Sequence, residues 1–267
     1  MKLLTLNTAG RLLKIQDQIK ELVSENCDLI CLQEVIQNSK KIFYEELPKY
    51  GYKWIADSSF ENISKHTGPR KYCLMTASRY RLKKLESLYK VGWSEKMLMT
   101  ECKIGNKKIE IVNTYIPPGS SNGVRKLNTI KEIFENLKLS NYKYKILCGD
   151  WNSPQHEFAG GKIMSWGESI RKNGDTYISD KKYDDVERLF LERTNDLNLF
   201  DDFRRVNGYD KEEYSYYIYR KGLICAKRRF DHIYSTKNLN LRSCNYRHSF
   251  RKKLLSDHSA LVSEYKL

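Results

Sequence analysis

The sequence predicts an α/β fold in which sheets are covered by helices. Short apolar runs, typical of buried strands, alternate with longer segments whose apolar residues recur at three- and four-residue spacing, as in amphipathic helices. With 267 residues, 40% of them hydrophobic and 30% charged, the chain can bury a sizeable core. We expect one domain over residues 1–267, because no repeat, low-complexity tract or proline-rich linker divides the chain.

The alternation is clearest near the N-terminus. Residues 2–6 form an apolar run that ends at Asn7, the pattern of a buried strand that opens into a loop. Residues 11–25 predict a helix, and residues 29–32 form a second apolar run that stands just before Glu34. The apolar positions of the predicted helix are Leu12, Leu13, Ile15, Ile19, Leu22 and Val23.

The rest of the chain continues the pattern. Helical periodicity at residues 124–137 and 184–197 predicts two more helices. Residues 157–180 are rich in glycine and show no periodicity, so we expect a long surface loop, a kind of segment that is usually functional or disordered. Further strands are predicted at residues 72–77, 97–103, 109–115, 145–148, 230–234 and 260–265.

Charge and cysteine content restrict the partners. The 48 Lys and Arg residues outnumber 33 Asp and Glu, and the net charge of +15 favours a polyanion such as nucleic acid. An equally weighted interpretation is that an AT-rich genome supplies lysines that only solvate the surface. The N-terminal apolar run is too short for a signal peptide or a membrane span, so we expect no membrane partner. Seven cysteines without a CxxC pair fit a reducing cytoplasm, and we expect a monomer there.

Polar side chains stand where the predicted strands end, the position at which open α/β sheets gather ligands and catalytic groups. Each motif alone is more often a turn former or a helix cap. The whole set in this order is harder to explain in that way. These residues are Asn7, Glu34, Asp150 and Asn152 of GDWN, and Asp257 and His258 of SDH, with Asp231 at the start of a further strand.

Such a set suits the hydrolysis of a phosphodiester. That reaction needs a nucleophilic water, neutralisation of the charge on the transition state, and help for a departing alkoxide. Carboxylates and an amide offer oxygen ligands, which Mg²⁺ or Mn²⁺ prefer, so we expect one of these ions rather than zinc.

The same residues resemble the endonuclease/exonuclease/phosphatase superfamily, in order and spacing, across essentially the whole chain. Residues 113–120, NTYIPPGS, are similar to the tyrosine-containing loop of exonuclease III type abasic-site endonucleases. Deoxyribonuclease I and the sphingomyelinases typically have a histidine where Tyr115 stands. The aromatic residues Tyr216 and Phe230 resemble those that line the pocket for a flipped deoxyribose in abasic-site enzymes.

The resemblance implies a fold and an activity. The expected fold is a four-layer α/β sandwich, with two facing, mainly antiparallel sheets and helices outside. The expected activity is Mg²⁺- or Mn²⁺-dependent hydrolysis of a nucleic-acid backbone, with DNA as the leading substrate and DNA repair, by abasic-site endonuclease or 3′–5′ exonuclease action, as the leading role.

Roles of the metal and water sites are also implied by the resemblance. Glu34 would bind the metal, with Asn7 near it and Asp257 completing its surroundings. Asp150 would position or deprotonate the attacking water, and Asn152 would orient Asp150 or a phosphate oxygen.

The remaining roles concern the phosphate. His258, held by Asp231, would donate to the non-bridging oxygen on which charge develops, and Tyr115 would contact the phosphate. Arg228 and Arg229 belong to a basic stretch that would neutralise backbone phosphates.

Three departures from the abasic-endonuclease pattern leave the substrate open. Residues 8–12, TAGRL, differ from the usual sequence after the asparagine, residues 71–73, KYC, stand where many members have Gly, Val and Ala, and Arg228 replaces an aromatic residue. RNA, a phosphotyrosyl–DNA link and a small phosphoester are alternative substrates, although Tyr115 and the basic charge disfavour lipids and inositols. A non-catalytic DNA-binding module is a further alternative, disfavoured because every expected polar position is filled.

Overall fold

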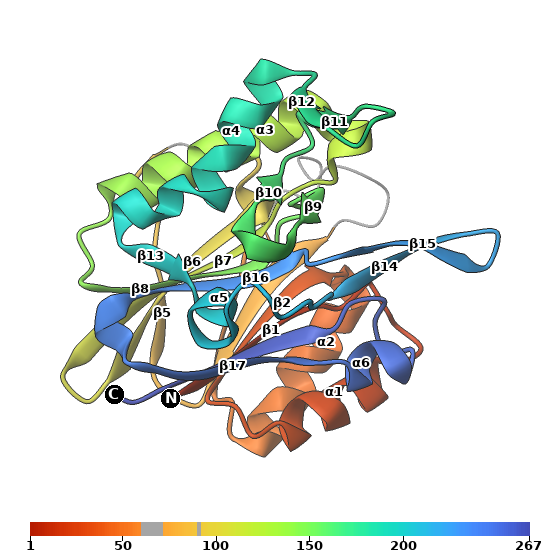
Figure 1. Cartoon of the computed structure of the whole chain (residues 1–267). Coiled ribbons are helices and arrows are strands. Elements are labelled where there is room, and N and C mark those ends of the chain that lie inside the picture. The colour runs from red at the N-terminus through yellow and green to blue at the C-terminus, as the bar shows by residue number, and fades with distance from the viewer. Residues whose placement is uncertain (60–71, 90–91) are drawn as a thin grey trace.

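The computed structural model describes residues 1–59, 72–89 and 92–267, apart from the side chains of residues 94 and 119–122. Two large sheets face each other (Figure 1). The first consists, in spatial order, of β17 (Leu241–Arg247), β18 (Ala260–Tyr265), β1 (Lys2–Asn7), β2 (Leu29–Val35), β4 (Cys73–Ser78) and β3 (Trp54–Asp57). The second consists of β13 (Leu199–Asp201), β16 (Asp231–Thr236), β8 (Tyr144–Asp150), β7 (Lys107–Tyr115), β6 (Met97–Ile104) and β5 (Leu82–Lys84).

The α-helices and three short hairpins are the other main elements of the described residues. The α-helices are α1 (Ile15–Ser24), α2 (Gln37–Glu46), α3 (Gly119–Leu139), α4 (Lys181–Leu191), α5 (Asp202–Asn207) and α6 (Ser249–Lys252). The hairpins pair β9 (His156–Glu157) with β10 (Ile163–Met164), β11 (Glu168–Ile170) with β12 (Thr176–Ile178), and β14 (Tyr216–Arg220) with β15 (Leu223–Arg228).

Alternation of apolar side chains along the strands builds four layers. Leu3 of β1 and Ile146 of β8 belong to the buried cluster between the two sheets. Leu4 points the other way and packs with Ile19 of α1, while Leu147 packs outward with the residues of α3 and α4. Only β1–β2 and β7–β8 are parallel among the paired strands of the two sheets. The predicted four-layer sandwich of mainly antiparallel sheets is therefore confirmed.

The first helix begins later than predicted. Its buried residues Ile15, Ile19 and Leu22 form the expected apolar face, but residues 11–14 are not helical. Leu13 is 99% exposed, so this leucine does not belong to the buried face. The prediction for residues 11–25 was wrong at its start because it counted two apolar residues of a surface turn as part of the helix.

The predicted long loop at residues 157–180 was also wrong, since this segment forms the hairpins β9–β10 and β11–β12. Their strands are only two or three residues long, too short for sequence periodicity. The segment packs tightly on the start of α4, because a Cβ at Gly167 would lie 2.4 Å from the backbone nitrogen of Asp184. Asp180 caps α4 by accepting from the Tyr183 N–H at 3.0 Å, so the helix begins at residue 181 rather than at 184.

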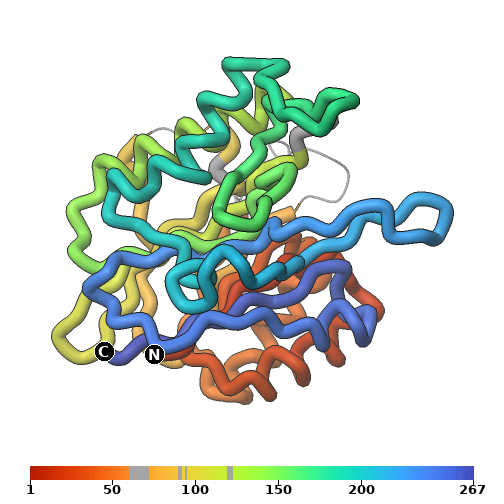
Figure 2. The backbone as a smooth tube through the Cα atoms, viewed as in Figure 1, coloured from red at the N-terminus to blue at the C-terminus, as the bar shows by residue number. Residues whose placement is uncertain are grey.

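The chain ends lie beside each other and the β14–β15 hairpin projects from the body (Figures 1 and 2). The Met1 amino group donates to the Tyr265 carbonyl at 2.8 Å. No helix in the described ranges is both long and apolar enough to cross a bilayer. All seven cysteines lie in these ranges and are free thiols.

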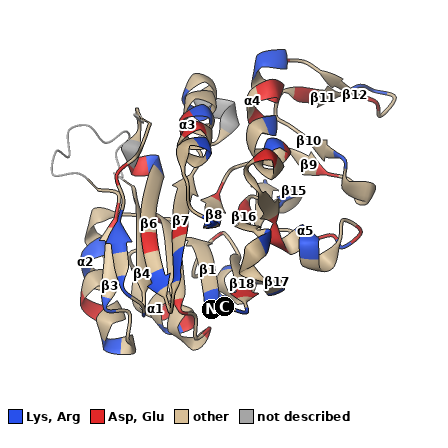
Figure 3. Cartoon of the chain, turned by 90° about the vertical axis from the view of Figure 1, so that its left-hand side faces the viewer, with Lys and Arg blue, Asp and Glu red and all other residues tan. Residues whose placement is uncertain are grey.

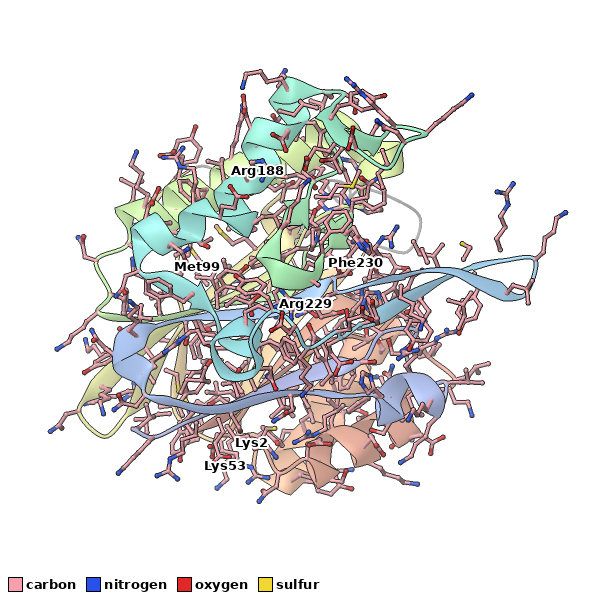
Figure 4. All side chains as sticks on the ribbon, viewed as in Figure 1. Lys2, Lys53, Met99, Arg188, Arg229 and Phe230 are labelled. Carbon is pink, nitrogen blue, oxygen red and sulfur yellow. The ribbon has the colours of Figure 1, made fainter. Side chains whose placement is uncertain are left out.

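A buried ion-pair network joins the β9 strand to β13, α5 and the end of β15. Arg229, labelled in Figure 4, is 4% exposed and binds Glu157 through two hydrogen bonds of 2.6 and 2.8 Å. Arg204 donates to the same carboxylate at 2.6 Å, and Asp201 binds Arg229 from the other side. Burial raises the pKa of Glu157, but the two arginines outweigh it and hold this pKa at about 2, below its ordinary 4.5.

We predict that the Glu157 network stabilises the fold in a pH-dependent manner. Because its folded-state pKa is depressed, the stabilisation is present above pH 4.5 and is lost as the pH falls toward about 2. The difference in free energy of unfolding between wild type and Glu157→Gln should shrink by ~2 kcal/mol between about pH 6 and about pH 3 in urea denaturation. Glu45→Gln, which removes a surface ion pair with Lys41, is the control. A difference for Glu157→Gln that stays constant over this range would contradict the network.

Candidate active site

Strand register brings the predicted site residues to one edge of the sandwich. Parallel pairing places Asn7 beside Gln33, one residue before Glu34. In the other sheet, Asp150 at the end of β8 pairs with both Tyr115 of β7 and Asp231 of β16. The ends of these central strands therefore lie at the same edge of the two facing sheets. An isolated bridge between Tyr216 and His258 adds two further predicted residues there.

Side-chain hydrogen bonds cross between the sheets near this edge. Asn7 donates to the Asp150 carboxylate at 2.8 Å, and Gln33 donates to Asn113 Oδ1 at 2.7 Å. Asn113 donates back to the Leu32 carbonyl at 3.2 Å. We call Asn7, Gln33, Asn113 and Asp150 the polar seam. All four side chains are at most 1% exposed, so breaking these bonds would leave unpaired buried polar groups.

The central group consists of Asp150, Asp231 and His258, whose ligand atoms lie within 4.8 Å of one another. His258 Nδ1 lies 2.7 Å from Asp231 Oδ2, and His258 Nε2 lies 3.8 Å from Asp150 Oδ2. The Asn152 backbone N–H donates to Asp150 at 2.9 Å, and Asn152 itself adopts a left-handed φ of 48°. The predicted cluster residues Asp150, Asn152, Asp231 and His258 thus meet.

Burial and charge shift the titration of this group. Burial raises the pKa of Asp150, and the neighbouring Asp231 adds to the rise, while His258 opposes it. For His258, burial disfavours the charged form, but Asp231 and Asp150 outweigh it and raise the pKa to about 10. The imidazole is therefore protonated at neutral pH and can donate to an anion.

Glu34 is not among the three clustered residues and lies beside Tyr115. A register shift in β2 between Leu32 and Val35 and a left-handed φ of 53° at Glu34 turn this residue out of the regular strand. Burial raises the pKa of Tyr115, and the nearby charge of Glu34 and a hydrogen bond between the two side chains add to the rise. Tyr115, which we expect to contact the phosphate, therefore lies next to Glu34, the predicted metal ligand.

Lys96 is a site residue that the sequence did not single out. Its ammonium lies 4.4 Å from the centroid of the Tyr115 ring, and the residue is only 6% exposed. Burial lowers the pKa of Lys96, while the charges of Glu95, Glu34 and Asp150 raise it. It lies one residue before β6, and nothing in the local sequence distinguishes it from the other lysines.

The predicted substrate-binding residues comprise an aromatic pair next to His258 and two arginines at or just after the end of β15. Tyr216 is half-buried and stacks between Phe230, at a centroid distance of 5.6 Å, and His258, at 4.7 Å. Phe230, labelled in Figure 4, is 4% exposed and supports Tyr216 from behind. Arg228 is half-buried at the end of β15. Arg229 lies inside the ion-pair network described above and stabilises the fold there. The prediction that Arg229 contacts backbone phosphates was therefore wrong.

Asp257 lies apart from the cluster of ligand atoms. Its side chain is exposed, although its charge helps to raise the pKa values of its neighbours His258 and Tyr216. The structure thus places Asp257 at the outer side of the edge.

A second buried ion pair holds the GDWN loop. Lys126 of α3, fully buried, lies 2.7 Å from the Glu187 carboxylate of α4 and donates to the Asn152 carbonyl at 2.9 Å. It also donates to Ser153 at 2.6 Å, and Trp166 donates to the Asn152 carbonyl at 2.9 Å. Nothing in the sequence indicated this role, because the partners of Lys126 lie on α4 and in the GDWN loop.

The residues present fit a hard divalent cation. Two buried carboxylates face a single imidazolium at the centre, and Glu34 adds another negative charge. Within the described ranges, Asp231 Oδ1 has no hydrogen-bond partner. Carboxylate and amide oxygens predominate among the donors, as Mg²⁺ and Mn²⁺ require.

Comparison with known structures supports the fold. An AP endonuclease from Archaeoglobus fulgidus is 19% identical with a TM-score of 0.72, and the match covers 100% of both chains. A 3′–5′ exonuclease (NExo) from Neisseria meningitidis is 18% identical with a TM-score of 0.71, again over 100% of both chains. D. rerio TDP2 complexed with single strand DNA product is 13% identical with a TM-score of 0.70, over 100% of this chain and 99% of that one. At these identities the likeness establishes the fold alone.

Sequence comparison establishes the family. Comparison with curated proteins gives no match. The model of the Endonuclease/Exonuclease/phosphatase family matches residues 4–258, a span that begins within β1 and ends at His258. The matched span therefore contains the whole cluster at the sheet edge. The chain belongs to the endonuclease/exonuclease/phosphatase family, as the order of its polar motifs predicted.

Proposed function

We propose that the protein is a divalent-metal-dependent phosphodiesterase that hydrolyses a nucleic-acid backbone, with DNA as its substrate and DNA repair as its role. The observation that carries the proposal is the buried group of Asp150, Asp231 and His258 at the edge where both sheets end. A base, an acid and an acidic cation site lie together there, in a chain of a family of nucleases and phosphatases.

The cation would be held by Glu34 and Asn7, with Asp257 in its outer surroundings. When bound, Mg²⁺ or Mn²⁺ supplies positive charge that neutralises the phosphate and stabilises the departing alkoxide. Among the described residues, Glu34 offers a carboxylate that is not committed to the His258 cluster. Because Glu34 and Asn7 would hold the cation, Asp150 remains available to position or deprotonate the attacking water.

Asp150 and His258 would supply the proton transfers. Burial makes Asp150 a stronger base than an exposed carboxylate, and hydrogen bonds from Asn7 and Asn152 fix its orientation for an attacking water. His258, kept protonated by Asp231, would donate to a non-bridging phosphate oxygen as charge develops on it. Tyr115 and Lys96 would contact the same phosphate from the Glu34 side.

The charge of the surface supports a polyanionic substrate. In the view of Figure 3, Lys and Arg occur on helices of both outer layers as well as on strands, so the net charge of +15 is widely spread. Such a charge raises the local concentration of nucleic acid without selecting a sequence. The choice between abasic, nicked, intact or single-stranded DNA and RNA is made by comparing cleavage of these substrates side by side.

We predict metal-dependent cleavage that requires both Glu34 and Asp150. The purified protein should nick DNA that carries an abasic analogue in Mg²⁺ and not in EDTA. Glu34→Gln and Asp150→Asn should each lower kcat by about 10³-fold, because they remove the cation ligand and the base. Glu86→Gln, an exposed carboxylate beyond β5, is the matched control. Equal nicking by Glu34→Gln and wild type would show a contaminating nuclease, and cleavage of RNA alone would reassign the substrate.

We also predict that Lys96 contributes to phosphate binding. Lys96→Met removes the charge with little change in volume, so the fold should persist while kcat/KM falls by about 10²-fold. Lys96→Arg should recover part of the loss, because the guanidinium restores a cation. Thermal unfolding followed by circular dichroism verifies the fold of both variants. Unchanged kcat/KM in a folded Lys96→Met variant would exclude Lys96 from the phosphate site.

A further inference from the structure

A groove of about 870 Å³ adjoins the candidate active site. Its walls are residues 9–14, which follow β1 and Asn7, residues 36–38, which follow β2 and Glu34, and Leu254. We call it the leucine groove. Two of its walls therefore continue the strands that carry Asn7 and Glu34.

Three exposed leucine side chains line the groove. Leu13 is 99% exposed, Leu254 is 72% exposed and Leu12 is 37% exposed. Single exposed leucines are ordinary, but several around one hollow form an apolar patch, the kind of surface that marks a binding site. Leu254 has a left-handed φ of 56°, a strained conformation for a leucine.

The wall of the groove is closely packed at Gly10. A Cβ at Gly10 would lie 3.0 Å from Cε1 of the Tyr72 ring and 3.3 Å from Cγ2 of Ile36, so the backbone packs directly on these side chains. Gly10 also has a left-handed φ of 58°. Close packing at Gly10 therefore holds this part of the wall in place.

Polar and charged side chains accompany the leucines. Arg11 and Lys14 are exposed in the first wall, and Gln37 and Asn38 are exposed in the second. Apolar surface beside cations and amides matches a nucleotide whose base is uncovered, since the base offers an apolar face and hydrogen-bonding edges while the phosphate offers negative charge. A duplex backbone hides its bases in the stack and presents mainly phosphate and sugar, to which exposed leucines offer nothing.

We propose that the leucine groove holds unpaired nucleotides next to the scissile phosphate, so that the preferred substrate is a strand that is single or splayed at the cut. This inference rests on the proposed function and specifies its substrate. The leucines contact the base faces, and Arg11 and Lys14 neutralise the adjoining phosphates.

Binding without metal tests the proposal separately from catalysis. We would measure dissociation constants by fluorescence anisotropy in EDTA for one labelled oligonucleotide, either single-stranded or annealed to its complement. Wild type should bind the single strand about 10-fold more tightly than the duplex, since each base contact is a sizeable part of the binding energy.

The variant Leu13→Ser/Leu254→Asn tests the leucines directly. Both residues are exposed, and asparagine tolerates the left-handed backbone at position 254, so the fold should be retained. Affinity for the single strand should fall about 10-fold and affinity for the duplex less than about 2-fold. Leu88→Ser, at a leucine that is 61% exposed beyond β5, is the matched control and should leave both constants unchanged.

A second variant tests the cations. Arg11→Ala/Lys14→Ala should weaken binding of the single strand and reduce its salt dependence by a slope of about 0.7 for each lost phosphate contact. The proposal is overturned if wild type binds duplex as tightly as single strand, or if Leu13→Ser/Leu254→Asn weakens both equally. Strand-selective binding by a protein that cleaves nothing in Mg²⁺ would refute the proposed phosphodiesterase while supporting the groove. Cleavage without strand selectivity would refute the groove alone.

Discussion

Hydrophobic contact between two facing sheets is non-directional, and in this protein the polar seam fixes how the sheets lie on each other. Asn7 of the first sheet donates to Asp150 of the second, and Gln33 and Asn113 form a second link behind it. Each bond is buried, so any sliding of the sheets would leave unpaired polar groups at a cost of about 1–3 kcal/mol apiece. The position of Asp150 relative to Glu34, and with it the geometry of the proposed catalysis, depends on this constraint.

The same edge carries charge and backbone strain that a stable fold alone would not require. Asp150 and Asp231 are both buried and share one imidazolium, and Glu34 and Asn152 adopt left-handed backbone conformations. Such features raise the free energy of the folded state, and the surrounding structure compensates for them. The Lys126–Glu187 pair under the GDWN loop and the Glu157–Arg229 network beneath Phe230 are two of these compensating supports.

The part of the site that could be predicted from sequence is the part carried by strand ends. Asn7, Glu34 and Asp150 each follow an apolar run, His258 and Asp231 were found in the same pattern, and the resemblance added the roles of these residues. Lys96, Lys126 and the Gln33–Asn113 link could not be found in this way, because their partners come from other elements and depend on packing. For the same reason Arg229 was misassigned, since a basic stretch in sequence does not distinguish a surface arginine from one paired inside with Glu157.

For the fold, too, the sequence predicted the central elements and missed the short peripheral ones. Long apolar runs identified the central strands, whereas the two- and three-residue strands of residues 157–180 and the edge strands β3 and β5 are stabilised mainly by their neighbours. The exposed leucines at positions 12 and 13 extended the helical pattern falsely. These two leucines lie outside the core and line the leucine groove.

One measurement addresses the cation site itself. Crystals grown with Mn²⁺ and measured at the manganese absorption edge would locate the ion by its anomalous signal. We predict a manganese ion bound to the Glu34 carboxylate at the shared edge of the two sheets, next to the cluster of Asp150 and His258. A manganese peak elsewhere, with none at Glu34 in crystals of active protein, would contradict it.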